Sequence, residues 1–214
     1  MSGRWLNERR KDPYYRRAKD EGYRSRAAYK LKQLNDRFGF LDGARRVLDL
    51  GAAPGGWLQV ASESLPEDGI VLGVDLDDIK PLGLPNVRTL VGDATEGETQ
   101  REILDILSGK ADVVLSDMAP DVSGAWDLDQ YRQIYLARVA LVLADRLLEE
   151  DGWFIVKTFE GSEHVRYVRD VKAVFKRVKI VKPKASRRES AENFIVAHLL
   201  KERRRLPEEF RKDT

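Results

Sequence analysis

The sequence contains no cysteine and only two histidines among its 214 residues. The absence of cysteine excludes disulfide bonds, thiolate metal ligands and cysteine nucleophiles. Because His164 and His198 lie far apart in the sequence, we expect no histidine-based metal site. No apolar run approaches the roughly 18 to 20 residues needed to cross a bilayer. Residues 1–11 are charged and lack an apolar core, so we expect neither a membrane anchor nor a signal peptide.

Charged residues make up 35% of the chain, and although the net charge is only +2, the positive charges are concentrated in two segments. Residues 1–32 contain 11 Lys or Arg against 4 Asp or Glu, and residues 171–188 contain 8 Lys or Arg and no acidic residue. The first segment also carries aromatic side chains, a mixture suited to phosphate contacts and base stacking. Two basic segments favour a polyanionic partner such as RNA, with a solvated basic surface as the alternative.

The length suits one domain, which we place at residues 23–200, between a basic N-terminal arm at residues 1–22 and a charged C-terminal tail at residues 201–214. Short apolar runs predict buried strands at residues 45–50, 70–75, 87–91, 111–116 and 153–158. Helical spacing predicts helices at residues 25–38, 57–65, 99–107, 128–150 and 165–177.

Two further strands, at residues 178–181 and 194–200, follow each other without a helical pattern between them. They predict an antiparallel hairpin at one edge of the sheet. The fold class is therefore α/β, a Rossmann-like doubly wound and mostly parallel seven-stranded sheet. Sheets of this kind bind ligands at the carboxyl ends of their strands.

The segment from Leu48 to Trp57 is the end of a strand, a glycine-rich turn and the start of a helix. Gly51, Gly55 and Gly56 permit a positive φ and a close backbone approach, so that helix N-terminal N–H groups can face a ligand. Their spacing differs from the Gly-x-Gly-x-x-Gly of dinucleotide enzymes, which disfavours a nicotinamide dehydrogenase. The turn predicts a cofactor pocket, and an ordinary strand-to-helix turn is the alternative.

Four polar residues end successive predicted strands. Asp75 stands where a carboxylate commonly accepts both hydroxyls of a ribose, and Asp93 could receive an adenine amino group or could instead cap the next helix. Lys157 and Asp117 end neighbouring strands, so their side chains could meet over the sheet. Lys157 could act there as a base toward a hydroxyl, while the structural alternatives are a solvent-directed lysine or a simple ion pair.

The chain carries four motifs in order: RSRAAYKL at residues 24–31, DLGAAPGGW at 49–57, SDMAP at 116–120 and VK at 156–157. Together they closely resemble the FtsJ/RrmJ family of RNA ribose 2′-O-methyltransferases, and the similarity spans nearly the whole chain. The resemblance implies S-adenosylmethionine as cofactor, and from the absence of cysteine and the distant histidines we expect no metal. By motif position, that cofactor would contact Gly55, Trp57, Asp75, Asp93 and Asp117, within a pocket that includes Gly51 and Gly56.

The resemblance also implies a catalytic tetrad. Its members would be Lys30, Asp117, Lys157 as general base, and a glutamate just before the last strand. Counting back from that strand favours Glu192, with Glu189 as the alternative.

Compact members of the family modify large-subunit ribosomal RNA, so we expect a cytoplasmic, monomeric enzyme that methylates a uridine ribose of that RNA or of the assembled subunit. Close relatives act on tRNA, which is an alternative. A base methyltransferase is disfavoured because residues 116–120 lack the Asn/Asp-Pro-Pro-aromatic run. A non-catalytic RNA-binding assembly factor would retain the same pocket, and an activity assay separates it from the enzyme.

Overall fold

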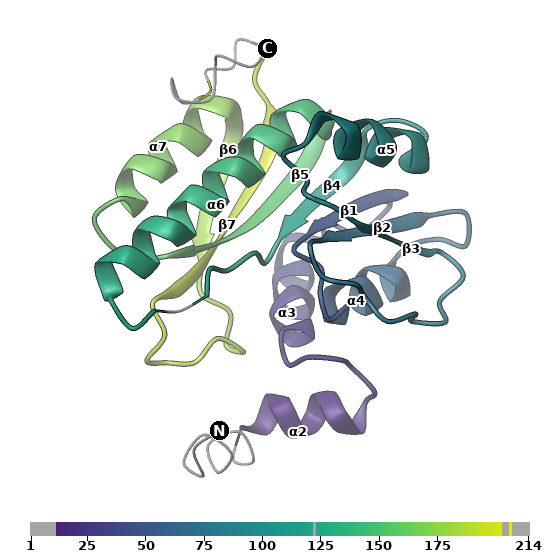
Figure 1. Cartoon of the computed structure of the whole chain (residues 1–214), viewed down its shortest axis with the longest axis horizontal. Coiled ribbons are helices and arrows are strands. Elements are labelled where there is room, and N and C mark those ends of the chain that lie inside the picture. The colour runs from purple at the N-terminus through teal and green to yellow at the C-terminus, as the bar shows by residue number, and fades with distance from the viewer. Residues whose placement is uncertain (1–11, 122, 203–205, 207–214) are drawn as a thin grey trace.

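Seven strands form one sheet in the computed structural model, which describes residues 12–121, 123–202 and 206 (Figure 1). The strands are β1 (Arg46–Leu50), β2 (Ile70–Asp75), β3 (Val87–Val91), β4 (Ala111–Ser116), β5 (Leu148–Phe159), β6 (Phe175–Val181) and β7 (Glu192–Leu200). Their order is β3-β2-β1-β4-β5-β7-β6, and β7 runs antiparallel to both of its neighbours. The predicted fold class, including the C-terminal hairpin at one edge, is confirmed.

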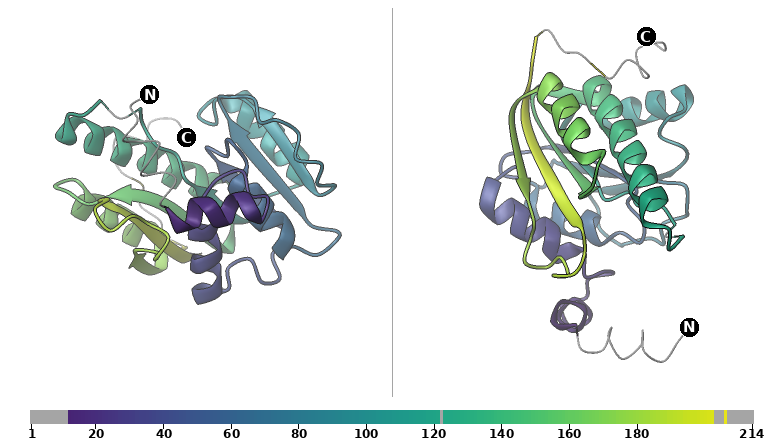
Figure 2. Two further views of the ribbon diagram at one scale, coloured as in Figure 1. Left: turned by 90° about the horizontal axis from the view of Figure 1, so that it is seen from below. Right: turned by 90° about the vertical axis from the view of Figure 1, so that its left-hand side faces the viewer.

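Helices cover both faces of the sheet, which gives three layers (Figure 2). The helices are α2 (Pro13–Asp20), α3 (Ala28–Phe38), α4 (Gly56–Ser64), α5 (Gly97–Leu107), α6 (Trp126–Leu147) and α7 (His164–Val174). One apolar core lies between the sheet and α5, α6 and α7, and a second lies between the sheet and α3 and α4. None of the described helices is long and apolar enough to cross a membrane.

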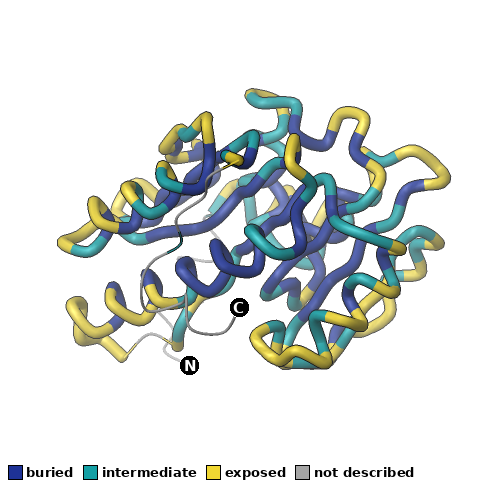
Figure 3. The backbone as a smooth tube through the Cα atoms, turned by 90° about the horizontal axis from the view of Figure 1, so that it is seen from above, coloured by how far each residue is buried: buried dark blue, intermediate teal, exposed yellow. Residues whose placement is uncertain are grey.

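The alternation of side chains along β5 determines to which face of the sheet Lys157 points. Phe154 and Val156 belong to the core under α6, whereas Ile155 belongs to the core under α3 and α4. Since successive side chains of a strand point to opposite faces, Lys157 falls on the face that α3 covers. All four residues lie in β5, which is buried along most of its length, and Figure 3 shows such buried segments in dark blue through the middle of the molecule.

Two predicted helices end three residues earlier in the structure, because strand pairing overrides helical spacing in both places. The helix predicted at residues 165–177 ends at Val174, and β6 begins at Phe175, which pairs with Leu200 and packs its ring against Phe154 at 5.7 Å. The helix predicted at residues 128–150 ends at Leu147, and Leu148 pairs with Ala111 as the first residue of β5. A tertiary partner, rather than local propensity, ends each helix.

Helix α2 lies within the predicted N-terminal arm, where we predicted no helix. Asp12 caps it by accepting hydrogen bonds from the backbone N–H groups of Tyr14 and Tyr15, and Pro13 opens the first turn. Asp followed by Pro is a recognisable helix start, so the sequence contained this signal. Residues 1–11 of the arm and most of the predicted tail lie outside the described residues.

Asp49 places a carboxyl group inside the sheet, on β1. The residue is 1% exposed, and neither carboxyl oxygen has a hydrogen-bond partner among the described residues. Burial raises the pKa of Asp49 well above its usual value, and the nearby carboxylates of Asp117 and Asp75 raise it further. The folded protein therefore holds the Asp49 proton to a higher pH than the unfolded chain does.

We expect Asp49→Asn to stabilise the protein increasingly as the pH rises above about 4, the pKa of an unfolded aspartic acid. Over this range the folded wild type binds more protons than the unfolded chain, so its free energy of unfolding falls with pH through this group. Asparagine cannot ionise and escapes that loss. Urea unfolding at several pH values measures the difference, with Asp36→Asn, at an exposed position of α3, as the control. A difference that stays constant with pH would contradict the shifted pKa.

Candidate active site

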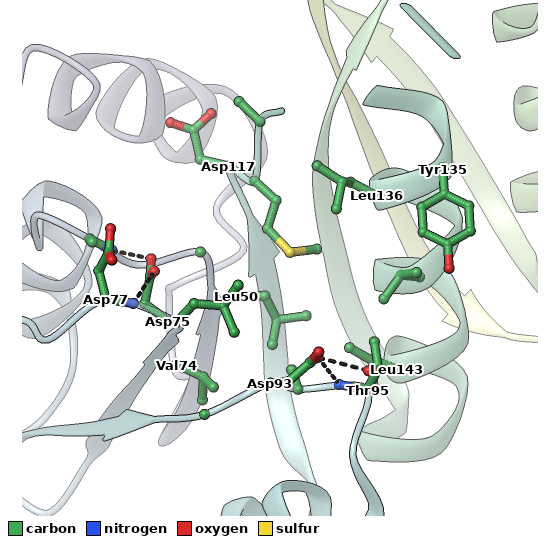
Figure 4. Close-up of a pocket in the computed structure, with 18 residues that line it drawn as sticks. Leu50, Val74, Asp75, Asp77, Asp93, Thr95, Asp117, Tyr135, Leu136 and Leu143 are labelled. Carbon is green, nitrogen blue, oxygen red and sulfur yellow. Dashed lines mark hydrogen bonds between the residues drawn. The ribbon is translucent and has the colours of Figure 1, made fainter. Parts of the chain in front are cut away.

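A cavity of about 530 Å³ opens at the carboxyl ends of β1, β2, β3 and β4, with one wall supplied by α6 (Figure 4). Its volume lies within the range of small-molecule sites. Its polar lining includes Gly51, Asp75, Asp93 and Asp117, and its apolar lining includes Leu50, Val74, Met118, Leu136, Val139 and Leu143. The cavity therefore lies at the strand ends at which the sequence places its ligand.

Gly51 is required at the floor of this cavity for two separate reasons. Its φ is 73°, a left-handed conformation that favours glycine. A Cβ at this position would stand 2.6 Å from Cγ of Met118, far inside van der Waals contact. The tight turn lets the Gly51 N–H donate to the Val74 carbonyl at 2.9 Å, which ties the end of β1 to β2.

Asp75 stands at the end of β2 with its carboxylate already oriented. Its Oδ2 accepts a hydrogen bond from the Ala53 N–H at 2.8 Å, and its Oδ1 accepts one from the Asp77 N–H at 3.0 Å. Each carboxylate oxygen offers about two lone-pair sites, so each can accept a second donor from a ligand. Two oxygens fixed side by side suit a pair of neighbouring hydroxyl groups.

Asp93 follows β3, the strand next to β2, and lines the same cavity as Asp75 (Figure 4). Its Oδ1 accepts hydrogen bonds from the N–H and the hydroxyl of Thr95, at 2.8 and 2.7 Å. Helix α5 begins at Gly97, two residues after Thr95, and its N-cap is Glu96. Asp93 thus shapes the turn before the helix rather than capping the helix itself.

Three residues of the glycine-rich segment lie next to the cavity without lining it. Gly55, with a φ of 106°, is the N-cap of α4, and Gly56 opens that helix close to Ser25. Trp57 is 3% exposed, and its ring nitrogen donates to the Ala27 carbonyl at 2.8 Å. The Trp57 side chain packs in the core, so a contact from this residue to a cofactor would have to come from its backbone.

Lys157 and Asp117 meet over the ends of β5 and β4. The Lys157 ammonium donates to the backbone carbonyl of Asp117, and its Nζ lies 3.0 Å from Oδ1 of the same residue. That 3.0 Å contact joins opposite charges but lacks hydrogen-bond geometry. Oδ1 of Asp117 can therefore still accept a hydrogen bond. Lys157 is 6% exposed, which rules out the solvent-directed alternative. The two residues form a nearly buried ion pair at the edge of the cavity.

Lys30 and Glu192 form a second ion pair, in which Nζ lies 2.6 Å from Oε2. The other carboxylate oxygen, Oε1, accepts a hydrogen bond from the Ser186 hydroxyl at 2.7 Å. Glu192 is buried as the first residue of β7, whereas Glu189 is exposed. Of the two candidate glutamates, Glu192 is the one that contacts Lys30.

The two ion pairs share one face of the sheet. Phe194 pairs in register with Lys157, and Lys30 Nζ lies 5.7 Å from the centroid of the Phe194 ring. Paired residues of neighbouring strands project to the same face, as do residues two apart along one strand. Glu192 and Lys157 therefore point to the same side, and the structure groups all four predicted tetrad residues on one face of the sheet, with Asp117 also lining the cavity.

Gln133 on α6 is a site residue that sequence analysis missed. It is 1% exposed, and its amide nitrogen donates to the carbonyls of Met118 and Lys157 at 3.1 and 3.0 Å. These two bonds hold the ends of β4 and β5 together beneath the ion pair. Nothing in the sequence separates this glutamine from other polar residues of the long helix.

The arrangement is suited to binding a polar ligand and activating a hydroxyl group. Asp75 and Asp93 present acceptors inside the cavity, the Lys157–Asp117 pair borders it through Asp117, and the Lys30–Glu192 pair lies on the same face of the sheet. Among the described residues, no group of three or more His, Asp or Glu side chains is placed to hold a metal ion. The chemistry available from the described side chains is hydrogen bonding, charge stabilisation and proton transfer.

Comparison with known proteins reveals extensive similarity. The ribosomal RNA large subunit methyltransferase E of Methanothrix thermoacetophila is 52% identical over 190 residues, which cover 89% of this chain and 73% of that protein. The protein of the same name from Methanothermobacter thermautotrophicus is 46% identical over 196 residues, covering 92% of this chain and 93% of the relative.

Solved structures show the same architecture. A crystal structure described as a putative ribosomal RNA methyltransferase from Plasmodium falciparum superposes with a TM-score of 0.72 at 28% identity, covering 83% of this chain and 98% of that one. The FtsJ-like methyltransferase family matches residues 23–199, a span that contains the cavity and both ion pairs. This chain therefore belongs to the FtsJ-like methyltransferase family.

Proposed function

We propose that this methyltransferase transfers a methyl group from S-adenosylmethionine to a ribose 2′-hydroxyl of RNA, with Lys157 as the general base. The observation that carries the proposal is that two lysine–carboxylate pairs share one face of the sheet and that one of them, through Asp117, borders a ligand-sized cavity. A hydroxyl is a weak nucleophile, and a base within hydrogen-bond reach is what its activation requires.

We further propose that the substrate is a uridine of large-subunit ribosomal RNA. The support comes from the relatives, which are named as methyltransferases of large-subunit ribosomal RNA. They are 46% to 52% identical over about nine-tenths of this chain. Ribosomal RNA as substrate agrees with the basic segments of the sequence. It also agrees with the cytoplasmic location and the monomeric state that we expect for this enzyme.

The cavity has the features that S-adenosylmethionine requires. Asp75 offers two oriented carboxylate oxygens for the ribose hydroxyls, and Asp93, at the end of the neighbouring strand, lines the same cavity as an acceptor for the adenine amino group. The apolar lining supplies walls for a planar base. At Gly51 a side chain would clash with Met118, so the tight turn that lines the cavity floor requires glycine.

When bound, S-adenosylmethionine supplies a methyl group activated by a positively charged sulfur. Asp117 holds the Lys157 ammonium through its carbonyl and carboxylate, so the amine has one orientation toward an incoming hydroxyl. Lys157, once it has lost its own proton, accepts the proton of the 2′-hydroxyl as that oxygen attacks. Lys30 and Glu192 position the ribose, and such alignment can contribute about 7 to 11 kcal/mol to lowering a barrier.

We expect Lys157→Met to reduce methyl transfer by at least about 100-fold, the lower range for loss of a general base, because it removes the amine but keeps most of the side-chain volume. The affinity for S-adenosylmethionine should change little, since the amine pairs with Asp117 at the edge of the cavity. Transfer is measured with labelled methyl on ribosomal subunits that lack the modification, and affinity by calorimetry. Lys176→Met, at an exposed position of β6, is the control.

Two results would oppose this role for Lys157. Near-normal transfer by Lys157→Met would remove the general base from the mechanism. Equal loss of transfer and cofactor binding would make Lys157 a structural residue.

We expect Asp75→Asn to weaken S-adenosylmethionine binding by about tenfold or more, because one acceptor oxygen is replaced by a donor and the charge is lost. Isothermal titration calorimetry gives the affinity directly. Asp78→Asn, an exposed neighbour that does not line the cavity, should bind as the wild type does. Equal affinity of the wild type and Asp75→Asn would remove Asp75 from the cofactor site.

A further inference from the structure

A second hollow, of about 480 Å³, lies between the start of α2 and the connection from β6 to β7. Figure 2 shows α2 crossing beside this connection in the view from below. The hollow, which we name the arginine pocket, is lined by Asp12, Pro13, Tyr14, Arg26, Lys184, Ser186, Arg187, Arg188 and Glu189. Its cations come from both basic segments of the sequence, and Arg26 and Arg187 are 161 positions apart in the chain.

The arginine pocket carries more positive than negative charge, with four cationic side chains against two carboxylates. Arg26 and Arg187 converge on one atom, Oδ2 of Asp12, with which Arg26 forms an ion pair and from which Nε of Arg187 lies 4.0 Å away. Burial lowers the pKa of Arg26, and the charge of Arg187 lowers it further. Two like charges are thus held together around an anionic oxygen, the arrangement that arginines present to a phosphate.

The loop that carries these cations is held in place by hydrogen bonds. Lys182 Nζ donates to the carbonyls of Arg188 and Ser190, at 3.1 and 2.5 Å, which closes the loop on itself. The Ala185 N–H donates to the side chain of Gln33 on α3 at 2.9 Å, which attaches the loop to the body of the protein. Arg187 and Arg188 are therefore exposed cations on an anchored backbone.

A single residue joins the arginine pocket to the candidate tetrad. Ser186 lines the pocket, and its hydroxyl donates to Glu192, whose other carboxylate oxygen pairs with Lys30. The pocket thus lies one hydrogen bond from the residues that position the target ribose in the proposed function.

We infer that the arginine pocket binds a phosphodiester group of the RNA strand close to the ribose that is methylated. This inference rests on the proposed function, because it takes the ribose to lie at Lys30 and Glu192. The excess of positive charge, the convergence of Arg26 and Arg187 on an anionic oxygen, and the link through Ser186 all favour an RNA strand that continues from the site. Asp12 holds the two arginines in place, while Lys184 and Arg188 add further positive charge.

The test compares two double variants that remove the same charge. Arg187→Ala/Arg188→Ala changes exposed residues of the arginine pocket, and Arg88→Ala/Arg101→Ala changes exposed residues of β3 and α5, outside the pocket and outside both basic segments. Binding to a short fluorescein-labelled oligouridylate is measured without S-adenosylmethionine between about 50 and 200 mM salt. The KM for ribosomal subunits in methyl transfer is measured alongside.

The Arg187→Ala/Arg188→Ala variant should bind RNA on the order of tenfold more weakly. The slope of log affinity against log salt should flatten by about 0.7 for each phosphate that the variant no longer neutralises. The Arg88→Ala/Arg101→Ala control should keep the wild-type slope. Equal affinities and slopes for the two double variants would overturn the inference.

The two proposals fail separately. Weakened RNA binding in the Arg187→Ala/Arg188→Ala variant of a protein that transfers no methyl group would refute the proposed function and leave an RNA-binding pocket. Methyl transfer with an unchanged KM and salt slope in that variant would refute the pocket alone.

Discussion

The antiparallel pairing of β7 with β5 is the interaction on which the candidate site depends. It sets Phe194 opposite Lys157 and so brings Glu192, which lies 35 positions further along the chain, onto the same face. A shift of this ladder by one residue would turn the Glu192 side chain toward α6 and separate it from Lys30. Because β7 also pairs with β6, it has a hydrogen-bonded strand on each side, and the register of its pairing with β5 is strongly specified.

The same pairing places two different surfaces on either side of one ion pair. The cavity lies toward Lys157 and Asp117, and the arginine pocket lies toward Ser186, so that Lys30 and Glu192 stand between them. Carboxylates and apolar walls suit a small ligand that carries hydroxyl groups, whereas converging arginines suit a phosphate. The ion pair between them is nearly buried, which holds its geometry but leaves little tolerance for the removal of one partner.

Much of the fold and part of the site could be predicted from residue patterns. Buried parallel strands have short apolar runs, and a glycine-rich turn between a strand and a helix has few alternatives, so the sheet and Gly51 could be placed in advance. The boundaries at Phe175 and Leu148 could not, because each residue fits a helical pattern and becomes strand only through a distant partner. The role of Gln133 and the meeting of the two basic segments in one pocket could not be predicted, because polar and basic residues are common on solvated surfaces.

The sequence by itself determined the order of strands and helices, the left-handed turn at Gly51 and the residue types that end each strand. These properties depend on local sterics and on the period of apolar residues, which neighbouring positions carry. Only the tertiary structure decided that Glu192 rather than Glu189 contacts Lys30, that Trp57 packs its ring into the core, and that Arg26 meets Arg187. Those contacts join residues far apart in the chain, and the register of the sheet and the packing of α2 and α3 against it determine which of them form.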